Sequence, residues 1–244
     1  MSNVSFSHTV LQITDPHLLE DSAAILEGVN TETSLIGVLD AAFAERQPDL
    51  VLATGDITHE GARVAYERFR NHLALRTNAP LVCLPGNHDL ADAFGEISDP
   101  VTLHPWRIIA IDSHVDDEVG GAITSAELAR LDAEISAAPE FVIIALHHPV
   151  LACGSPWLDK DGIFSGRLHK IIESSKKVRC VVHGHIHQAF EKCHNGVLYL
   201  GTPSTCYQFE PRSKKFSIDS SLPGYRWLSL SDTGDIDTQV SRIS

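Results

Sequence analysis

The feature that most constrains this chain is a series of short apolar runs that each end in polar residues. Short, continuous apolar runs are typical of strands that are buried on both faces of a sheet. Segments with helical spacing separate the early runs, and this order predicts largely parallel strands with helices on the sheet faces. We expect the early strands at residues 10–14, 50–54, 81–84, 106–111, 141–146 and 180–182.

Three intervening segments carry helix signals. Residues 32–45 place apolar side chains on one face, and residues 61–75 do the same with Val64, Phe69 and Leu73 inward. A third helix is expected to begin at Thr124, where the Thr-x-x-Glu spacing to Glu127 predicts a reciprocal capping box.

The last part of the chain has strand patterns without helices between them, at residues 197–200, 226–230 and 237–241. This pattern predicts an antiparallel addition to the first sheet or a second sheet. The sequence contains no internal repeat, low-complexity tract or Pro/Ser-rich linker. We therefore expect an α/β (α+β) protein with a single domain over residues 1–244.

Composition excludes several classes of protein. The chain is 43% apolar and 21% charged, and it has no apolar run approaching the ~20 residues of a membrane span. The N-terminus lacks the basic and apolar regions of a signal peptide, which favours a cytoplasmic location without a membrane. The net charge of −13, without a basic patch, argues against a nucleic-acid partner. Five dispersed cysteines argue against a disulfide framework.

Polar clusters follow five of the predicted strands. In an open α/β sheet, ligands bind beyond the carboxyl ends of the strands, so these clusters are expected to converge on one site. Each cluster alone can be read as turn chemistry or as a satisfied core histidine, but their joint occurrence favours a functional site. The clusters are Asp15 and His17 in TDPH; Asp56 in TGDITH; Asn87, His88 and Asp89 in GNHD; His147 and His148 in LHHP; and His183, His185 and His187 in HGHIH.

The side chains in these clusters are carboxylates, imidazoles and an amide, without a thiolate. This set excludes a structural zinc site of the cysteine type and suits Fe or Mn, or alternatively Zn, in a hydrolytic centre. The donors are too numerous for one ion, which favours two ions bridged by one carboxylate. Bound cations would also let an acidic chain act on an anionic substrate.

The motifs D-x-H, G-D, G-N-H-D, H-H-P and G-H-x-H occur in this order between Asp15 and His187. This arrangement resembles the calcineurin-like metallophosphoesterases. The resemblance implies a four-layer αββα sandwich of two mixed β-sheets flanked by helices, with a dinuclear metal centre. It implies one metal held by Asp15, His17, Asp56 and His187, and another held by Asp56, Asn87, His147 and His185. It also implies that His88 is catalytic without binding either metal, and that the substrate phosphate meets His17, Asp56, Asn87, His88 and His187.

Local reasoning supports this partition. Asp15 and His17 lie two residues apart on what is expected to be an extended segment, so they can point the same way, and His185 and His187 do likewise. Ile186 is then left to face the core.

The other residues of the five clusters have supporting or unresolved roles. Gly86 is expected to permit a tight turn, Asp89 and His183 to support the site, and His148 is the alternative to His147 as a ligand. We expect surface or core positions for His8, His59, His72, His104, His114, His169 and His194.

Further segments narrow the resemblance to the bacterial class III cyclic nucleotide phosphodiesterases: LQITDPHLL, GVNTETS, WLD, GHIHQ and TPSTCYQFEP. This resemblance implies hydrolysis of 3',5'-cyclic AMP to 5'-AMP by attack of a metal-bridging hydroxide, with His88 contacting the phosphate or protonating the leaving group. The alternative is another phosphoester, such as a 2',3'-cyclic nucleotide, a glycerophosphodiester or a phosphoprotein. The segment CGSPWLD departs from the pattern by an extra residue, which affects the shape expected of the substrate loop.

The expected partner is a small cyclic nucleotide. The GVNT and PSTC segments offer hydroxyls and amides that could meet it, and Tyr207 and Phe209 could stack on its base or be alternate positions of an edge strand. Whether the chain is a monomer or a homodimer is left open by the sequence.

Overall fold

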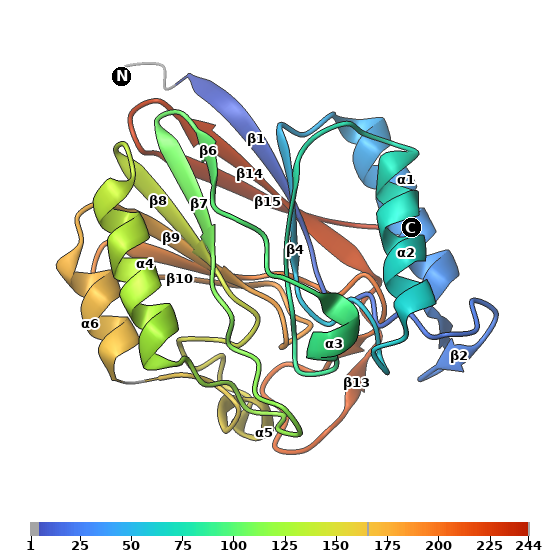
Figure 1. Cartoon of the computed structure of the whole chain (residues 1–244). Coiled ribbons are helices and arrows are strands. Elements are labelled where there is room, and N and C mark those ends of the chain that lie inside the picture. Colours follow the sequence, from blue (N-terminus) through green and yellow to red (C-terminus); the bar gives the residue numbers. More distant parts are fainter. Residues whose placement is uncertain (1–4, 165, 244) are drawn as a thin grey trace.

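The computed structural model describes residues 5–164 and 166–243, which form two β-sheets packed face to face with helices on both outer faces (Figure 1). Helices α1 (Thr31–Glu45) and α2 (Arg63–Ala74) cover one sheet. Helices α4 (Ser125–Ala137) and α6 (Arg167–Ser174) cover the other. The four-layer αββα arrangement that the sequence predicted is confirmed.

The first sheet has five strands in the order β15-β14-β1-β4-β5. Strands β1, β4 and β5 are parallel, whereas β14 and β15 add to the edge at β1 in antiparallel fashion. Two of the three predicted late strands therefore extend the first sheet in antiparallel fashion. The third, predicted at residues 197–200, lies in the second sheet and is parallel to one of its neighbours there, so the prediction is wrong for this strand. The bounds are β1 Phe6–Ile13, β4 Leu50–Thr54, β5 Leu81–Leu84, β14 Gly224–Ser231 and β15 Ile236–Arg242.

The second sheet has six strands in the order β10-β11-β9-β8-β7-β6. Strands β11, β9, β8 and β7 are parallel, and the two edge strands are antiparallel to their neighbours. Both sheets are thus mixed. The bounds are β6 Val101–Leu103, β7 Trp106–Ala110, β8 Phe141–Ala145, β9 Val178–His183, β10 Phe190–His194 and β11 Val197–Gly201.

The central strands β4, β5 and β8 are largely apolar because both of their faces are buried. In β4, Val51 and Ala53 pack towards the helices, whereas Leu50 and Leu52 pack against the opposite sheet. The layer between the sheets is a continuous apolar cluster that draws on strands of both sheets, which fixes how one sheet lies on the other.

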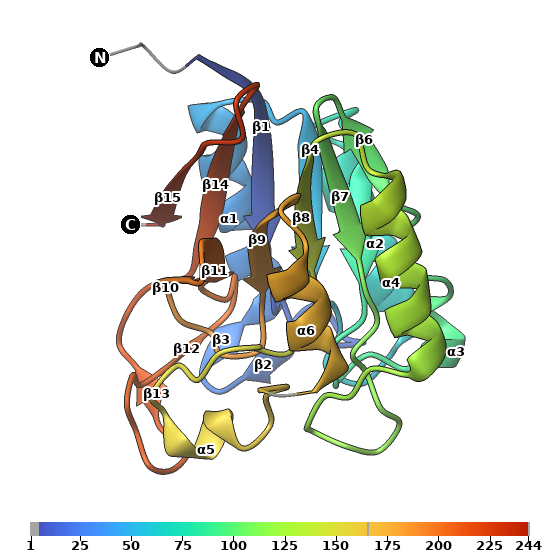
Figure 2. The same ribbon diagram turned by 90° about the vertical axis from the view of Figure 1, so that its left-hand side faces the viewer.

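The parallel strands of both sheets end at the same side of the molecule (Figure 2). Short elements lie around this end: the pairs β2 (Ile25–Leu26) with β3 (Val29–Asn30) and β12 (Gln208–Phe209) with β13 (Ile218–Asp219), and the one-turn helices α3 (Ala91–Phe94) and α5 (Pro156–Asp159). Together with the strand ends, they form the setting of the candidate site.

Two local predictions about the helices are wrong. Val64 lies on the outer face of α2 and is 40% exposed, whereas Phe69 and Leu73 are buried as predicted. Thr124 does cap α4 by accepting from the Glu127 N–H, but the Glu127 carboxylate accepts from the Asp112 N–H instead of returning to Thr124. The reciprocal half of the capping box therefore does not form, because Glu127 ties the helix to the end of β7.

The short strands β2, β3, β6 and β13 and the edge strand β10 were not predicted from the sequence, whereas β12 corresponds to the edge strand that was left open at Tyr207 and Phe209. The strand β10 (FEKCH) is largely exposed and polar, so it carries no apolar run. Within the described residues, none of the helices is long and apolar enough to cross a membrane. The five cysteines are all free thiols.

A buried arginine joins the two sheets. Arg226 of β14 is 2% exposed, and its guanidinium donates to the hydroxyls of Thr202 and Thr238 at 3.2 and 2.7 Å. It also donates to the carbonyl oxygens of Phe190 and Gly201, at 3.2 and 3.0 Å, on the second sheet. A buried cation is tolerated only when its N–H groups have hydrogen-bond partners. Because the partners of Arg226 lie on both sheets, this side chain fixes the position of one sheet relative to the other.

We expect Arg226→Leu to lower the free energy of unfolding by about 3 kcal/mol, because buried carbonyl groups would lose their donors. Urea denaturation followed by circular dichroism measures the change. The matched control is Arg63→Leu on the exposed start of α2, which should stay within about 0.5 kcal/mol of the parent protein. Equal stabilities of the two variants would contradict this role of Arg226.

Candidate metal centre

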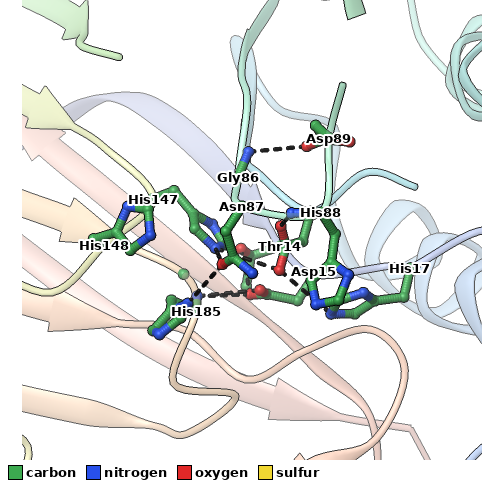
Figure 3. Close-up of polar contacts among 12 residues, drawn as sticks. Thr14, Asp15, His17, Gly86, Asn87, His88, Asp89, His147, His148 and His185 are labelled. Atoms are coloured by element: carbon green, nitrogen blue, oxygen red, sulfur yellow. Dashed lines mark hydrogen bonds and ion pairs between the residues drawn. The ribbon is translucent and has the colours of Figure 1, made fainter. Parts of the chain in front are cut away.

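The five predicted polar clusters converge where the two sheets meet (Figure 3). Strands β1, β4 and β5 of the first sheet deliver Asp15, Asp56 and Asn87. Strands β8 and β9 of the second sheet deliver His147 and His185. The expectation that the clusters share one site is confirmed, with the addition that both sheets contribute to it.

The backbone presents these side chains differently from the prediction. Asp15 and His17 have φ values of 51° and 47°, and His185 and His187 have values of 66° and 48°. All four lie in the left-handed region, as does Asp56 at 49°, so the segments are not extended. Asp and His are among the few residues with a β-carbon that enter this region readily, and such conformations gather at functional sites.

Glycines allow the strand ends to approach one another. A β-carbon at Gly86 would lie 2.2 Å from Asp56 Oδ1 and 2.7 Å from His147 Cε1. A β-carbon at Gly184 would lie 2.2 Å from Thr14 Oγ1. A tight turn begins at Gly86, whose carbonyl accepts from the Asp89 N–H at 3.3 Å, as the sequence predicted. Gly86 does not have a positive φ, so glycine is required there for close packing against Asp56 and His147.

Four donor atoms form a first set between β1, β4 and the segment after β9. His17 Nε2 lies 3.2 Å from His187 Nε2 and 3.6 Å from Asp56 Oδ2. His187 Nε2 lies 3.4 Å from Asp15 Oδ1. All four side chains are buried. This set corresponds to one of the two ligand groups expected from the sequence.

A second set of four donor atoms lies beside it. His147 Nε2 is 3.4 Å from Asp56 Oδ2 and 3.1 Å from Asn87 Oδ1. His185 Nδ1 is 3.0 Å from the same Asn87 oxygen. Asp56 Oδ2 thus belongs to both sets, which is the arrangement that a bridging carboxylate requires.

The charge states of the two carboxylates favour a bound cation. Burial alone would raise the pKa of Asp56, but His147 and His17 outweigh it and hold that pKa well below its usual range. Burial would likewise raise the pKa of Asp15, and His187 outweighs it, so that this pKa is also lowered. Burial holds the pKa of His17 well below its usual value. The site therefore presents two carboxylates and a neutral imidazole.

Hydrogen bonds to carbonyl groups fix two of the ring tautomers. His147 Nδ1 donates to the Thr54 carbonyl at 2.9 Å, and His187 Nδ1 donates to the Tyr207 carbonyl at 2.8 Å. A carbonyl can only accept, so each Nδ1 carries the proton and each Nε2 turns a lone pair towards other acceptors. Lone pairs that face one another in a buried site need a cation or a proton between them, and this donor set therefore fits metal ions.

Without metal, a proton takes that place. Burial works against a charge on His147, but the attraction of Asp56 outweighs it and raises the pKa of His147 to about 9. The imidazolium therefore places a positive charge between Asp56 and Asn87, and a metal ion bound there would have to displace its proton.

Asp89 holds the turn that carries Asn87. Its Oδ2 accepts from the N–H groups of Gly86 and Ile57 at 2.9 and 3.1 Å. Its Oδ1 accepts from the Thr58 N–H at 3.0 Å and from the Tyr66 hydroxyl at 2.7 Å. Asp89 thereby ties the turn after β5 to the turn after β4, which confirms its expected orienting role.

The alternative ligand His148 has both ring nitrogens engaged elsewhere. Its Nε2 donates to the Val119 carbonyl at 3.0 Å, and its Nδ1 accepts from the Ser113 hydroxyl at 2.8 Å. His183 donates through Nδ1 to the Gly184 carbonyl at 2.9 Å and stays outside both donor sets. The structure thus favours His147 over His148 and leaves His183 at the strand end, as expected.

His88 lies beside the donor sets. Its backbone N–H donates to Asp56 Oδ1 at 2.8 Å, and its ring Nδ1 donates to the His59 carbonyl at 3.1 Å. The ring is held edge-on to His17, with centroids 4.8 Å apart, and its Nε2 is left free.

Sequence reasoning missed His59 and Asp161. His59 was expected outside the site, but its ring stacks on His88 with centroids 4.6 Å apart, and its Nδ1 lies 3.3 Å from His17 Nδ1. Its position three residues after Asp56, within the same motif, was the available signal. Asp161 lies 3.8 Å from His185 Nε2 and follows no predicted strand, so no pattern marked it.

The donor sets open into a cavity of about 300 Å³. Tyr207 and Phe209 both line it, so they are not merely edge-strand positions. Two of the polar side chains that were expected to meet a nucleotide are used elsewhere. Ser204 of the PSTC segment donates to the Asp15 carbonyl, and Asn30 of the GVNT segment caps α1. The expectation is therefore wrong for these two residues.

Comparisons of the sequence and of the structure with known proteins agree on one class, the phosphoesterases. Residues 8–189 match the family model described as calcineurin-like phosphoesterase. The 3',5'-cyclic adenosine monophosphate phosphodiesterase CpdA of Pseudomonas aeruginosa is 35% identical, over 96% of this chain and 89% of that protein. A 3',5'-cyclic-nucleotide phosphodiesterase of Nostoc sp. is 36% identical, over 96% of this chain and 92% of that protein. Among solved structures, a dimetal phosphatase from Danio rerio shares the fold, with a TM-score of 0.66 at 15% identity over 98% of this chain and 100% of that one.

Metal binding should release protons. Because the pKa of His147 is about 9 in the metal-free protein, metal ions compete with a proton below that pH. We expect the affinity for Mn²⁺ to rise by about tenfold per pH unit for each proton released as the pH increases from 6 towards 9. Isothermal titration calorimetry in buffers of different ionisation enthalpy measures both the affinity and the proton count. An affinity that is the same at pH 6 and pH 9 would contradict this coupling.

Proposed function

The chain belongs to the calcineurin-like phosphoesterase family, and we propose that it hydrolyses 3',5'-cyclic AMP to 5'-AMP at the site between its two sheets. Membership of the family makes it a metal-dependent hydrolase with two divalent ions, and the Asp and His cluster fits them. The substrate is carried over from relatives named for cyclic AMP and cyclic nucleotides that align with nearly the whole chain.

One observation carries the proposal: two sets of donor atoms share Asp56 Oδ2. We assign Asp15, His17 and His187, with Asp56, to one ion. We assign Asn87, His147 and His185, again with Asp56, to the other. The neutral Asn87 adds an oxygen donor to the second set without adding negative charge. The absence of a thiolate from either set favours Fe or Mn, with Zn as an alternative.

The cavity needs these ions in order to bind an anion. Its lining includes the carboxylates of Glu27, Asp56 and Asp161, whereas none of the described residues that line it is lysine or arginine. When bound, the two ions supply Lewis-acid stabilisation of phosphoryl oxygens and an activated water nucleophile. They also offset the carboxylate charge, which lets an acidic chain accept a phosphodiester.

His88 is proposed to act on the phosphate without binding metal. Its Nδ1 proton is committed to the His59 carbonyl, so Nε2 is the atom that can meet the substrate. In the protonated form, Nε2 can donate a proton to the leaving 3'-oxygen of a cyclic nucleotide. The stacked ring of His59 limits the rotation of His88 and keeps that atom directed into the cavity. Besides His88, the ligand residues His17, Asp56, Asn87 and His187 are proposed to surround the bound phosphate.

Several broader expectations stay part of this proposal. We propose that the whole chain forms one functional unit, since strands from both ends of the sequence build the first sheet. A cytoplasmic location is supported by five free thiols, which suit a reducing compartment.

The roles of Asp56 and His88 should separate experimentally. Asp56→Ala is expected to reduce the bound metal from two ions per chain to less than one, because both donor sets lose a member. His88→Ala keeps the backbone N–H that donates to Asp56, so it should keep both ions and lose roughly 10²–10⁴-fold in kcat. Metal content by mass spectrometry and steady-state rates measure the two effects. His194→Ala, at an exposed histidine of β10, is the control and should match the parent protein in both. Equal metal loss in Asp56→Ala and His88→Ala would overturn the division of roles.

The substrate assignment is tested by a panel assayed on the Mn²⁺-loaded protein. We expect kcat/KM for 3',5'-cyclic AMP to exceed the values for 2',3'-cyclic AMP, glycerophosphodiesters and a phosphoserine peptide by at least tenfold. Chromatography should identify 5'-AMP as the product, because cleavage at the 3'-oxygen leaves the phosphate on the 5' position. A preparation that cleaves another diester but leaves cyclic AMP intact would refute the assignment.

A further inference from the structure

The cavity beyond the donor atoms has an apolar wall that the proposed chemistry does not use. Trp157 and Leu158 of α5 contribute to it, and Phe209 and Phe216 contribute from the other side. Helix α5 and the β12–β13 pair lie next to each other at this end of the molecule (Figure 2). The wall and the donor atoms line the same cavity, so one molecule can contact both.

Two of the aromatic rings near the site already have partners. Phe209 stacks on His187 with centroids 4.2 Å apart and an interplanar angle of 19°. Tyr207 lies nearly parallel to His17 at 5.9 Å and 20°. These rings pack against the proposed metal ligands and hold them in place, so each has one face that is unavailable to a ligand.

Phe216 and Trp157 are in a different situation. Phe216 is 51% exposed although it lines the cavity, and its ring stands at 73° to Trp157 with centroids 5.7 Å apart. Trp157 Nε1 is buried and has no hydrogen-bond partner among the described residues. The exposed ring of Phe216 gains free energy when a planar aromatic molecule covers it, and the Trp157 ring, which also lines the cavity, holds Phe216 in an edge-to-face contact.

Cationic side chains flank the exposed ring. Arg212, Lys214 and Lys215 precede Phe216 in the same segment, all three are exposed, and none of them forms an ion pair with the described residues. In a chain with a net charge of −13, such a segment attracts anions to one part of the surface. An anionic molecule with an aromatic group matches both features.

We propose that Trp157 and Phe216 form a base subsite, in which Phe216 stacks on the purine of the substrate while its phosphate occupies the donor sets. This inference rests on the proposed function and specifies which part of the substrate is recognised outside the metal centre. Stacking requires only an aromatic face, so the subsite selects a purine over a substrate without a base and discriminates little between adenine and guanine.

The test compares substrates with and without a base. For Phe216→Ala we expect kcat/KM for 3',5'-cyclic AMP to fall about tenfold, mainly through KM, because stacking contributes to binding and not to the chemical step. Hydrolysis of methyl riboside 3',5'-cyclic phosphate, which lacks the base, should stay within about twofold of the parent protein. Phe216→Tyr should retain activity on cyclic AMP, whereas Phe216→Leu should behave like the alanine variant, which separates stacking from apolar burial.

The matched control is Phe6→Ala, which removes an exposed phenylalanine from the start of β1, at the other end of the strand from the site. It should leave both substrates unaffected. If Phe216→Ala lowers the rates on both substrates equally, or lowers neither, the base subsite is refuted. Full activity of Phe216→Leu on cyclic AMP would also refute it.

A second measurement keeps this inference separate from the substrate assignment. With bis(p-nitrophenyl) phosphate as the reporter substrate, AMP should inhibit the parent protein at least tenfold more tightly than ribose 5-phosphate does. In Phe216→Ala this ratio should approach one. A protein that does not hydrolyse cyclic AMP but shows this change in ratio would refute the proposed function and support the base subsite. Equal inhibition of the parent protein by the two compounds would refute the base subsite alone.

Discussion

The structure depends on one carboxylate, that of Asp56, which belongs to two sets of donor atoms. Its Oδ2 faces His17 on one side and His147 on the other, and its Oδ1 accepts from the backbone of His88. Donor atoms reach this carboxylate from both sheets, because His17 follows β1 and His147 follows β8. The lack of a side chain at Gly86 lets the turn after β5 pack closely against both Asp56 and His147. The left-handed backbone at Asp56 and the ties made by Asp89 also serve to hold this geometry.

The same arrangement limits the electrostatic cost of burying Asp15 and Asp56. Two buried carboxylates without compensation would be costly, since burial disfavours the charged form of each. The imidazole of His147 offsets that cost by holding a proton next to Asp56. At the proposed centre a metal ion would replace this proton, so metal binding and protonation of His147 are expected to compete.

Sequence reasoning recovered the parts of the molecule that depend on local pattern. A short apolar run predicted the strand over residues 50–54. Sequence motifs marked the donor residues that follow the strands, and the family resemblance implied the αββα layers. It failed where a contact across the molecule decides the outcome. The Glu127 carboxylate accepts from the Asp112 N–H near the end of β7, and no sequence pattern marks that contact. His59 belongs to the same motif as Asp56, but only its stacking on His88 shows that it is part of the site. Val64 was placed inward together with Phe69, although it precedes Phe69 by five residues, which brings it about 140° away around the helix, so the two side chains cannot share one buried face.

The central claim is that two metal ions share Asp56. Anomalous diffraction from crystals of the Mn²⁺-loaded protein tests it most directly. We predict two anomalous peaks about 3.5–4 Å apart, both within bonding distance of Asp56 Oδ2. One of them should contact Asp15 and the other Asn87. A single peak, or two peaks of which only one contacts Asp56, would contradict the account.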